Sequence, residues 1–395
     1  MAGKLLPLAL LMLAFTAAFG QKTSENHKFL KDIQAEIDKD SVAWKYQTGA
    51  VHYTFAGNYQ QALLTWDQGM PTRTYTPTAA DSAILKSSTL KNARDYIVDR
   101  AKTEQIVIIN EAHHNPKHRT FTRSLLAGLY QNGYRYLGLE AIADSSINTR
   151  TYATQNSGYY TNEPEFGNLI HEARSLGFTI FEYEAGPDKN GKEREIEQAQ
   201  NIQAFMKSHP NGKYLIHCGF DHVYEKDVQY WEKAMAGRLK EYTNIDPFTI
   251  DQVKFTEKSK AGSGHYFIYA TGEKEPFVLL NQNKEVFNGI REPKQTDIVV
   301  VHPITQYTNG RPEWLCAGKK AYRLPKNKLK KHPLPIQVLA YRVDEYNNNG
   351  IPADIIEIHS KEQYDSLYLK KGDYLIVLRN QQYEVIDSLV LHHAD

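Results

Sequence analysis

The hydrophobic pattern between residues 105 and 140 predicts a strand, a helix and a second strand. An uninterrupted apolar run at 106–109 is typical of a buried strand, and the segment after Pro116 has helical periodicity over roughly four turns. Gly133 marks a turn before a second apolar segment, 134–139. This order predicts a β–α–β unit, whose two strands lie parallel in one sheet.

The same alternation continues along the chain. Apolar segments at 178–183 and 214–216 predict two further strands, and helical patterns at 165–176 and 192–207 separate them. Gly177 follows the first of these helices, where a glycine often ends a helix. The sequence therefore predicts an α/β fold with a mostly parallel sheet flanked by helices.

The rest of the chain divides into segments of different character. Residues 21–102 are predicted to be a helical N-terminal region that includes a helix at 80–101, and 103–309 the α/β core. Within the core we expect a helix at 223–242, a loop with a short helix at 244–255, a hairpin of 265–270 with 277–280, and a strand at 297–301. Residues 310–395 are predicted to form a small β-rich module with strands at 336–341, 354–359, 374–379 and 383–390.

The N-terminus has the pattern of a secretory signal. Lys4 precedes an apolar run of 16 residues that ends in small residues at Gly20, and a polar segment follows. The run is shorter than the roughly 20 residues that a membrane span needs. We therefore expect residues 1–20 to be a signal peptide, and the protein to be exported to a periplasmic or extracellular location without a membrane span.

Charge and cysteine content narrow the classes of function. Without residues 1–20, which carry one Lys and no acid, 46 basic and 46 acidic residues remain. This balance argues against a nucleic-acid partner, which requires a basic surface. Cys218 and Cys316 are the chain's two cysteines. Export permits a disulfide between them, but their spacing does not decide it.

The predicted strands end in acids and imidazoles. The first ends in Glu111, followed by His113 and His114; the second in Glu140; the third in Glu182 and Glu184; and the fourth in His217, followed by His222. Right-handed crossovers bring the carboxyl ends of parallel strands to one edge of a sheet, where ligands bind. These groups can transfer protons or ligate a metal.

The same residues carry a family resemblance. The run Asn110–Glu111–Ala112–His113–His114–Asn115–Pro116–Lys117–His118–Arg119, followed by Glu140, resembles the signature of the erythromycin-esterase-like/ChaN/Tiki superfamily. In ChaN-like members a Gly stands where this chain has Asn110. The motif 219–222 is similar to that superfamily's Gly-x-x-His, and 194–201 to its Arg-containing helix. The resemblance covers about residues 90–225.

The resemblance implies three different activities. Esterase-like members use a His as general base on water, Tiki-like members are similar to metal-dependent peptidases, and ChaN-like members resemble haem-binding lipoproteins. The esterase spacing Glu-x-x-His selects His114, whereas the ChaN-like spacing Glu-x-His selects His113. Both residues are present, so the sequence leaves this choice open.

We expect an exported hydrolase that activates water on an ester, lactone or amide of a small molecule or peptide. Its expected catalytic residues are Glu111, His113, His114, Glu140, His217 and His222. A Glu would orient a His that takes the proton from water. Arg194 and Glu184 are expected to bind substrate, and Arg194 is also a candidate to stabilise an oxyanion.

Two cofactor hypotheses remain beside this one. Candidate ligands for a divalent metal such as Zn²⁺ or Mn²⁺ are Glu111, His113, Glu140 and His222. The alternative function is a haem- or metal-binding protein without catalysis, in which His113 or His118 would be an axial haem ligand.

Three further expectations concern residues outside this cluster. Arg119 and Arg123 lie one turn apart, and a solvated helix face is the expectation for both. Cys218 is not expected to be a nucleophile, because the adjacent His217 on a strand points to the opposite face. The β-rich module is expected to add stability or substrate selection rather than chemistry.

Overall fold

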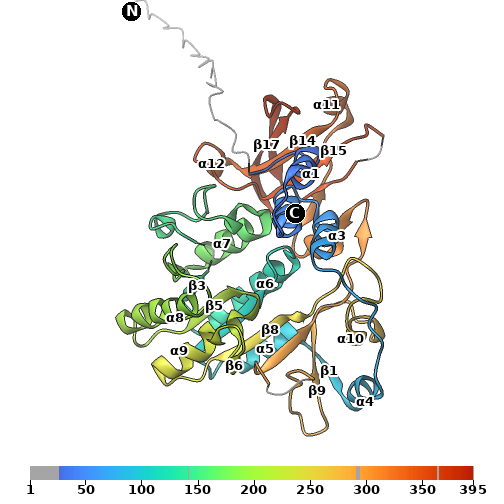
Figure 1. Ribbon diagram of the computed structural model, residues 1–395. Helices are drawn as coiled ribbons and strands as arrows, with labels where there is room; N and C mark the ends of the chain where they lie inside the picture. The colour runs from blue at the N-terminus through green and yellow to red at the C-terminus, as the bar shows by residue number, and fades with distance from the viewer. Residues whose placement is uncertain (1–25, 141, 291–293, 363, 395) are drawn as a thin grey trace, which may run out of the picture.

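An eight-stranded sheet forms the centre of the protein. The computed structural model describes residues 26–140, 142–290, 294–362 and 364–394; the expected signal peptide lies outside them. The strand order is β1(Thr89–Asn92), β9(Phe277–Leu280), β10(Ile298–Val301), β8(Phe248–Phe255), β2(Ile106–Glu111), β5(Tyr214–Gly219), β3(Tyr136–Leu139) and β4(Thr179–Glu182). From β10 to β4 neighbouring strands run parallel, whereas β9 pairs antiparallel with both β1 and β10. The predicted fold class is confirmed (Figure 1).

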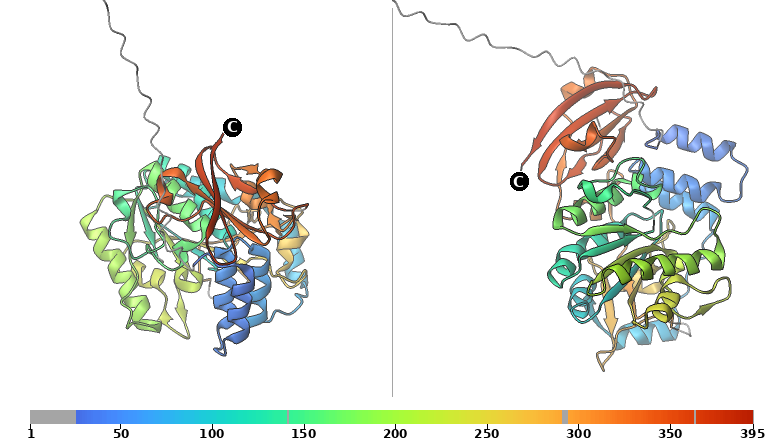
Figure 2. Two further views of the ribbon diagram at one scale, coloured as in Figure 1. Left: turned by 90° about the horizontal axis from the view of Figure 1, so that it is seen from above. Right: turned by 90° about the vertical axis from the view of Figure 1, so that its left-hand side faces the viewer.

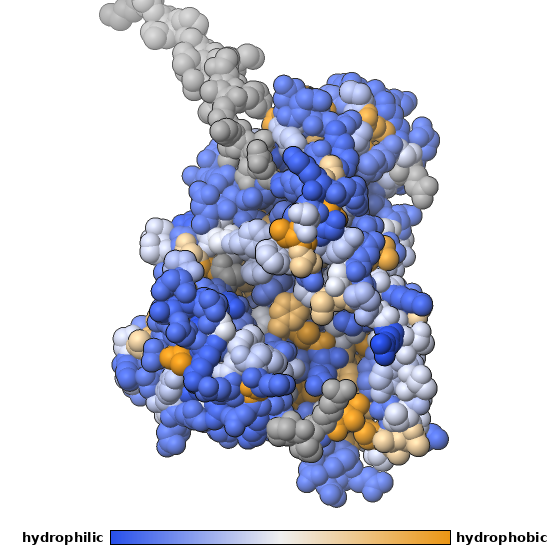
Figure 3. All heavy atoms as spheres, in the orientation of Figure 1, coloured by the Kyte–Doolittle hydropathy of each residue, from blue (hydrophilic) through white to orange (hydrophobic). Residues whose placement is uncertain are grey.

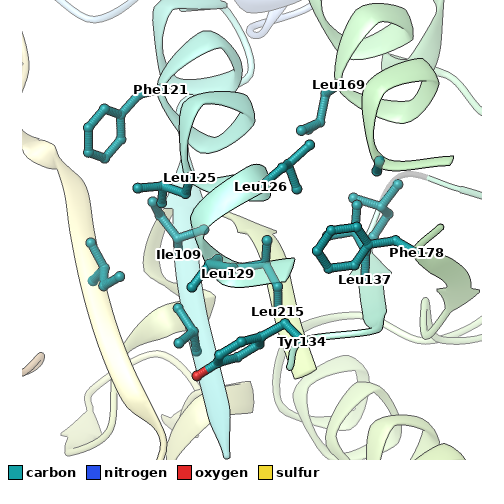
Figure 4. Packing of buried hydrophobic residues seen from close by; sticks show 14 of the residues in the cluster. Ile109, Phe121, Leu125, Leu126, Leu129, Tyr134, Leu137, Leu169, Phe178 and Leu215 are labelled. Carbon is teal, nitrogen blue, oxygen red and sulfur yellow. The ribbon is translucent and has the colours of Figure 1, made fainter. Parts of the chain in front are cut away.

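Helices cover both faces of this sheet. They are α5(Ala93–Arg100), α6(Lys117–Gln131) and α7(Pro164–Leu176) on one face, and α8(Gly191–Ser208) and α9(Met235–Thr243) on the other. Successive residues of β2 alternate between these layers: Val107 and Ile109 pack with α6, whereas Ile106 and Ile108 pack with α8 and α9. Figure 4 shows the α6 side of this core. The alternation also decides on which side of the sheet a residue at a strand end lies.

Local signals define the helix that follows the long loop. Glu163 caps α7 by accepting a hydrogen bond from the backbone N–H of Phe166, and Pro164 occupies the first helical position. Gly177 ends the helix with a φ of 99°, a left-handed conformation that glycine adopts without strain. The predicted end of this helix is confirmed.

Two smaller units flank the sheet. The N-terminal helices are α1(Leu30–Lys39), α2(Lys45–Phe55) and α3(Tyr59–Gly69), and the C-terminal sheet is antiparallel in the order β15(Asp354–Ile358), β14(Ile336–Arg342), β17(Gly372–Arg379) and β18(Val385–His393). The predicted C-terminal strands are therefore confirmed. Figure 2 shows this sheet beside α1, and Gln337 donates a hydrogen bond to the Lys28 carbonyl at 2.8 Å.

Several predicted elements were wrong. The segment expected to be a loop with a short helix is the central strand β8, and the segment 265–270 is the short helix α10(Tyr266–Ala270), not half of a hairpin. The predicted helix at 223–242 is helical only in α9. The predicted helix at 80–101 is broken into α4(Ala79–Ser87), β1 and α5, so the N-terminal region contributes an edge strand to the main sheet.

The surface in the orientation of Figure 1 is mostly hydrophilic, and its hydrophobic residues lie in separate groups (Figure 3). Among the described residues, every helix is too short or too polar to cross a bilayer.

Candidate functional site

The predicted acids and imidazoles meet at the carboxyl edge of the parallel strands. Strand register places Glu111 of β2 beside Gly219 of β5, and Leu139 of β3 beside His217 of β5. Side-chain alternation then places Glu111 and His217 on the α6 side of the sheet and Glu140 on the α8 side. The site therefore has two halves.

The Glu111 carboxylate is the centre of the α6 half. Arg119 of α6 donates to both of its oxygens at 2.7 Å. Its Oε1 also bonds with His113 Nδ1 at 2.8 Å, and its Oε2 with His217 Nε2 at 2.9 Å. Burial raises the pKa of Glu111, but these partners outweigh it and hold the pKa well below its usual range. With two donors on each oxygen, Glu111 is a fixed anion that orients its neighbours.

His113 is the most accessible imidazole bonded to Glu111. Its side chain is 13% exposed, whereas the side chain of His217 is 2% exposed. The ring stacks on Tyr160 with centroids 3.9 Å apart. Because Nδ1–H donates its hydrogen bond to Glu111, Nε2 is left as the nitrogen with the free lone pair. Gly219 makes this ring position possible, since a Cβ there would lie 2.6 Å from Nε2.

His217 has both ring nitrogens engaged inside the protein. Its Nε2 contacts Glu111, and its Nδ1 lies 3.3 Å from the hydroxyl of Thr122 on α6. A buried imidazole whose two nitrogens bond with a carboxylate and a hydroxyl has no nitrogen left to contact a substrate or water. His217 is therefore placed to hold Glu111.

Glu140 forms the α8 half together with Arg194. Arg194 donates to Glu140 Oε1 at 2.6 Å and to both oxygens of Glu184, at 2.9 and 2.7 Å. The backbone N–H of Gly219 donates to Glu140 Oε2. Burial raises the pKa of Glu140, but nearby His222, His113 and Arg194 lower it to about 2. Arg194 and Glu184 are about one-third exposed, so this half opens to solvent.

His222 is held by a second carboxylate, Glu195 of α8. Its Nδ1 lies 2.7 Å from a Glu195 oxygen, and its ring stacks on Trp231 with centroids 4.9 Å apart. Burial lowers the pKa of His222, but the carboxylates of Glu140 and Glu195 outweigh burial and raise the pKa above 6.5.

The two protonation states of His222 have different partners. Nε2 lies 3.1 Å from an Arg194 nitrogen and 3.4 Å from Glu140 Oε1. A guanidinium only donates, so the Arg194 contact requires neutral His222, whereas the protonated ring donates to Glu140. The contact with Arg194 favours the neutral ring of His222, whereas the raised pKa favours the protonated ring. We take protonated His222 as the resting form, because two carboxylates face the ring.

The structure separates the two adjacent histidines that the sequence left as alternatives. His114 turns away from Glu111 and stacks on Trp66 of α3, with centroids 3.8 Å apart and rings tilted by 8°. Burial lowers its pKa well below the usual range, so it is neutral. His113, not His114, therefore belongs to the Glu111 cluster.

Sequence reasoning missed or misplaced four residues in and beside the site. Arg119 and Arg123 are buried, so the expectation of a solvated face was wrong; carboxylates compensate both, with Arg123 2.9 Å from Glu165. Glu195 was missed although it adjoins the candidate Arg194 in the sequence. Tyr160 lies in the tyrosine-rich loop 148–163, whose composition gave no signal for one particular residue.

Glu163 connects this site to the N-terminal helices. It lies 3.1 Å from Arg119 and accepts a hydrogen bond from the Tyr59 hydroxyl at 3.2 Å. Burial raises its pKa from 4.5 to about 7, even though Arg119 lowers it. The folded protein therefore binds a proton that the unfolded chain releases, and between pH 4.5 and 7 this group's contribution to stability falls as pH rises.

The variant Glu163→Gln is expected to gain stability relative to wild type as the pH rises through this window. The relative gain between pH 4.5 and pH 8 should reach up to about 3 kcal/mol, because glutamine does not titrate. Urea unfolding at both pH values measures it, with exposed Glu193→Gln as the control. A difference from wild type that is the same at both pH values would contradict the raised pKa.

The residues present do not suit a metal ion. Arginine side chains already compensate Glu111 and Glu140, and the described residues contain no group of three or more His, Cys, Asp or Glu that could hold one. His114 and His118 have the spacing His-x-x-x-His, but His118 Nδ1 accepts from the Ala112 backbone N–H at 3.0 Å and its ring packs near His302. The four candidate metal ligands belong to two separate ion-pair clusters. Glu111 and His113 lie in one, and Glu140 and His222 lie in the other.

Haem also fits poorly. Axial ligation by His113 needs room for a porphyrin ring beside its imidazole, but this imidazole is only 13% exposed and stacks on Tyr160. His118 is fully buried.

The two cysteines are unpaired. Cys218 is buried and Cys316 is exposed. Burial raises the pKa of the Cys218 thiol well above its usual range, which disfavours a thiolate nucleophile.

Comparisons with known proteins give no family. No protein-family model and no curated protein matches the chain. A solved structure described as bacterial protein toxins is 14% identical, with 51% of this chain and 46% of that chain covered and a TM-score of 0.30. RRSP, a MARTX toxin effector domain from Vibrio vulnificus CMCP6, is 13% identical, with 68% and 48% covered and a TM-score of 0.31. The type III effector HopBA1 is 10% identical, with 45% and 95% covered and a TM-score of 0.29. The chain thus spans about half the length of the first two, and at these scores the likeness carries no argument.

Proposed function

We propose that this chain is a hydrolase that uses His113 as a general base to activate water against an ester, lactone or amide bond. The observation that carries the proposal is the fully bonded Glu111 carboxylate. An anion with four donors neither takes a proton nor attacks a substrate. It fixes the tautomer of His113 and stabilises the imidazolium that forms when Nε2 takes a proton.

Arg194 and His222 supply the complementary half of the reaction. Water deprotonated at His113 adds to the substrate carbonyl, and negative charge develops on the carbonyl oxygen. Arg194 is partly exposed and held by two carboxylates, which suits it to stabilise that oxygen. The tetrahedral adduct then collapses: the bond between the carbonyl carbon and the leaving oxygen or nitrogen breaks, and protonated His222 donates its Nε2 proton to the leaving group. Loss of the His113 proton to solvent and reprotonation of His222 restore the starting state. The substrate is a small molecule or peptide that enters beside Arg194 and Glu184.

The proposal predicts a specific alkaline limb in the pH profile of kcat. His222 must be protonated to act as the acid, so activity falls as pH rises through its raised pKa. In Glu195→Gln one of the two carboxylates that raise this pKa is neutral, and the limb should move to lower pH by about one unit or more. Profiles measured on a hydrolysable substrate give the shift directly.

The control for this prediction is Glu193→Gln on the same helix. Glu193 is 71% exposed and should leave the limb in place. An unshifted limb in Glu195→Gln would remove His222 from the role of acid. The substrate itself is found by screening esters, lactones and amides with and without a strong chelator. Turnover that the chelator abolishes would favour a metal-dependent reaction, and no turnover on any class would reject the hydrolase.

A further inference from the structure

A cavity of about 360 Å³ lies apart from the Glu111 and Glu140 clusters. It is bounded by α6, by the short helix η4(Glu313–Cys316), and by the segments before β9 and after β10. None of the catalytic candidates lines it. Its volume is in the range of small-molecule sites, which often form where two parts of a fold meet.

Apolar and aromatic side chains form much of its wall. Phe121 lies edge-on to buried His302, with centroids 5.2 Å apart, and Trp314 packs against buried Tyr59, with centroids 5.0 Å apart. Pro303 adds a rigid apolar surface. Because these rings are already packed against buried neighbours, an apolar ligand does not have to order them.

The two hydroxyl groups of the wall present acceptors. The Thr120 hydroxyl donates to Glu165 at 3.2 Å, and the Ser124 hydroxyl donates to the Phe121 carbonyl at 2.6 Å. Each hydroxyl has one hydrogen, which is thus used, and each oxygen keeps lone pairs that can accept. The cavity therefore favours a ligand that brings an O–H or N–H donor.

Lys117, the buried cation in the wall, does not favour an anionic ligand. Lys117 Nζ contacts the Pro303 carbonyl, Thr305 Oγ1 at 3.1 Å and Glu257 at 3.6 Å. A charge compensated by a buried carboxylate gains little from a second anion, whose own desolvation is costly. A neutral ligand suits this wall better.

We propose that this cavity is a binding site for a neutral aromatic molecule that carries a hydroxyl or N–H group. The aromatic body packs between Phe121 and Trp314, and the donor bonds to a hydroxyl oxygen of Thr120 or Ser124. The site does not depend on the hydrolase proposal, since the two share no residue.

Binding is tested with 2-naphthol and 2-methoxynaphthalene on the full-length protein by calorimetric titration. The first should bind with a dissociation constant on the order of 10–100 µM. The second has the same rings without the donor and should bind about threefold to tenfold more weakly. No binding of 2-naphthol at millimolar concentration, or equal affinity for the two probes, would overturn the proposal.

Two positions on α6 that are three residues apart give a matched pair of variants. Ser124 lines the cavity and Ala127 does not, and both are exposed. Ser124→Trp should fill the cavity and abolish binding, whereas Ala127→Trp should bind as wild type. Undiminished binding by Ser124→Trp would place the ligand elsewhere.

Cys316 gives a readout that needs no variant. This exposed thiol lines the cavity, while Cys218 is buried. In wild-type protein, 2-naphthol at ten times its dissociation constant should slow the reaction of Cys316 with a thiol reagent by about tenfold. An unchanged rate at saturating 2-naphthol would contradict occupancy of this cavity.

Discussion

Replacing His113 with glutamine is expected to lower kcat by about 10²–10⁴-fold, the usual contribution of a general base. Glutamine retains a polar side chain of similar reach but takes no proton at neutral pH. Glu111 keeps its three other donors, from Arg119 and His217, so the ion pair survives the change. The melting temperature should therefore fall by only a few degrees. Steady-state kinetics and a thermal melt on the same preparation separate the two effects.

His114→Gln is the matched control, because the two histidines are adjacent in sequence but diverge in space. His114 stacks on Trp66 and forms no part of the Glu111 cluster. Its replacement should cost packing energy while leaving kcat within a few-fold of wild type at temperatures where the variant is folded. If His114→Gln lowers kcat as strongly as His113→Gln, the assignment of the base to His113 is wrong.

Arg119→Met is expected to destabilise the protein by about 3–5 kcal/mol, the usual cost of breaking a buried ion pair on one side. Arg119 is 0% exposed and compensates Glu111, with Glu163 as a second carboxylate partner. Methionine fills a similar volume, so the cost comes from the Glu111 carboxylate that loses its counter-charge rather than from a cavity. Urea unfolding followed by far-UV circular dichroism measures the change in free energy.

An exposed pair and a double variant give the controls for this result. Arg94 is 56% exposed and pairs with Asp95, so Arg94→Met should change stability by less than about 1 kcal/mol. Adding Glu111→Gln to Arg119→Met removes one uncompensated charge and should recover part of the loss. If Arg119→Met lies within about 1 kcal/mol of wild type, the network is not the buried electrostatic centre that its geometry indicates.

The ends of the strands were predictable because they depend on the local hydrophobic pattern and on the right-handed crossovers between parallel strands. Apolar runs at 106–109 and 214–216 identified buried strands, and parallel pairing brings their carboxyl ends to one edge. The meeting of Glu111, Glu140, His217 and His222 at this edge follows from those two facts. No long-range information was needed beyond the order of strands and helices.

Strand β8 was missed because its polar residues are buried. The sequence predicted a loop here because of Thr249, Asp251 and Gln252. In the structure these residues are buried, and distant parts of the chain supply their hydrogen-bond partners. Asn110 bonds with Asp251 at 3.1 Å and accepts from the Gln252 backbone N–H at 2.8 Å. A hydrophobicity pattern predicts that such residues are exposed, because it carries no information about the groups that will form hydrogen bonds with them.

The sequence by itself determined the fold class and the edge of the sheet at which chemical groups gather. The tertiary structure decided which of those groups act together. It turned His113 toward Glu111 and His114 toward Trp66, and it buried Arg119 on a helix whose polar residues had suggested a solvated face. The physical reason is that periodicity reports where apolar area is buried, whereas the position of a charge depends on a compensating charge that can come from anywhere in the chain.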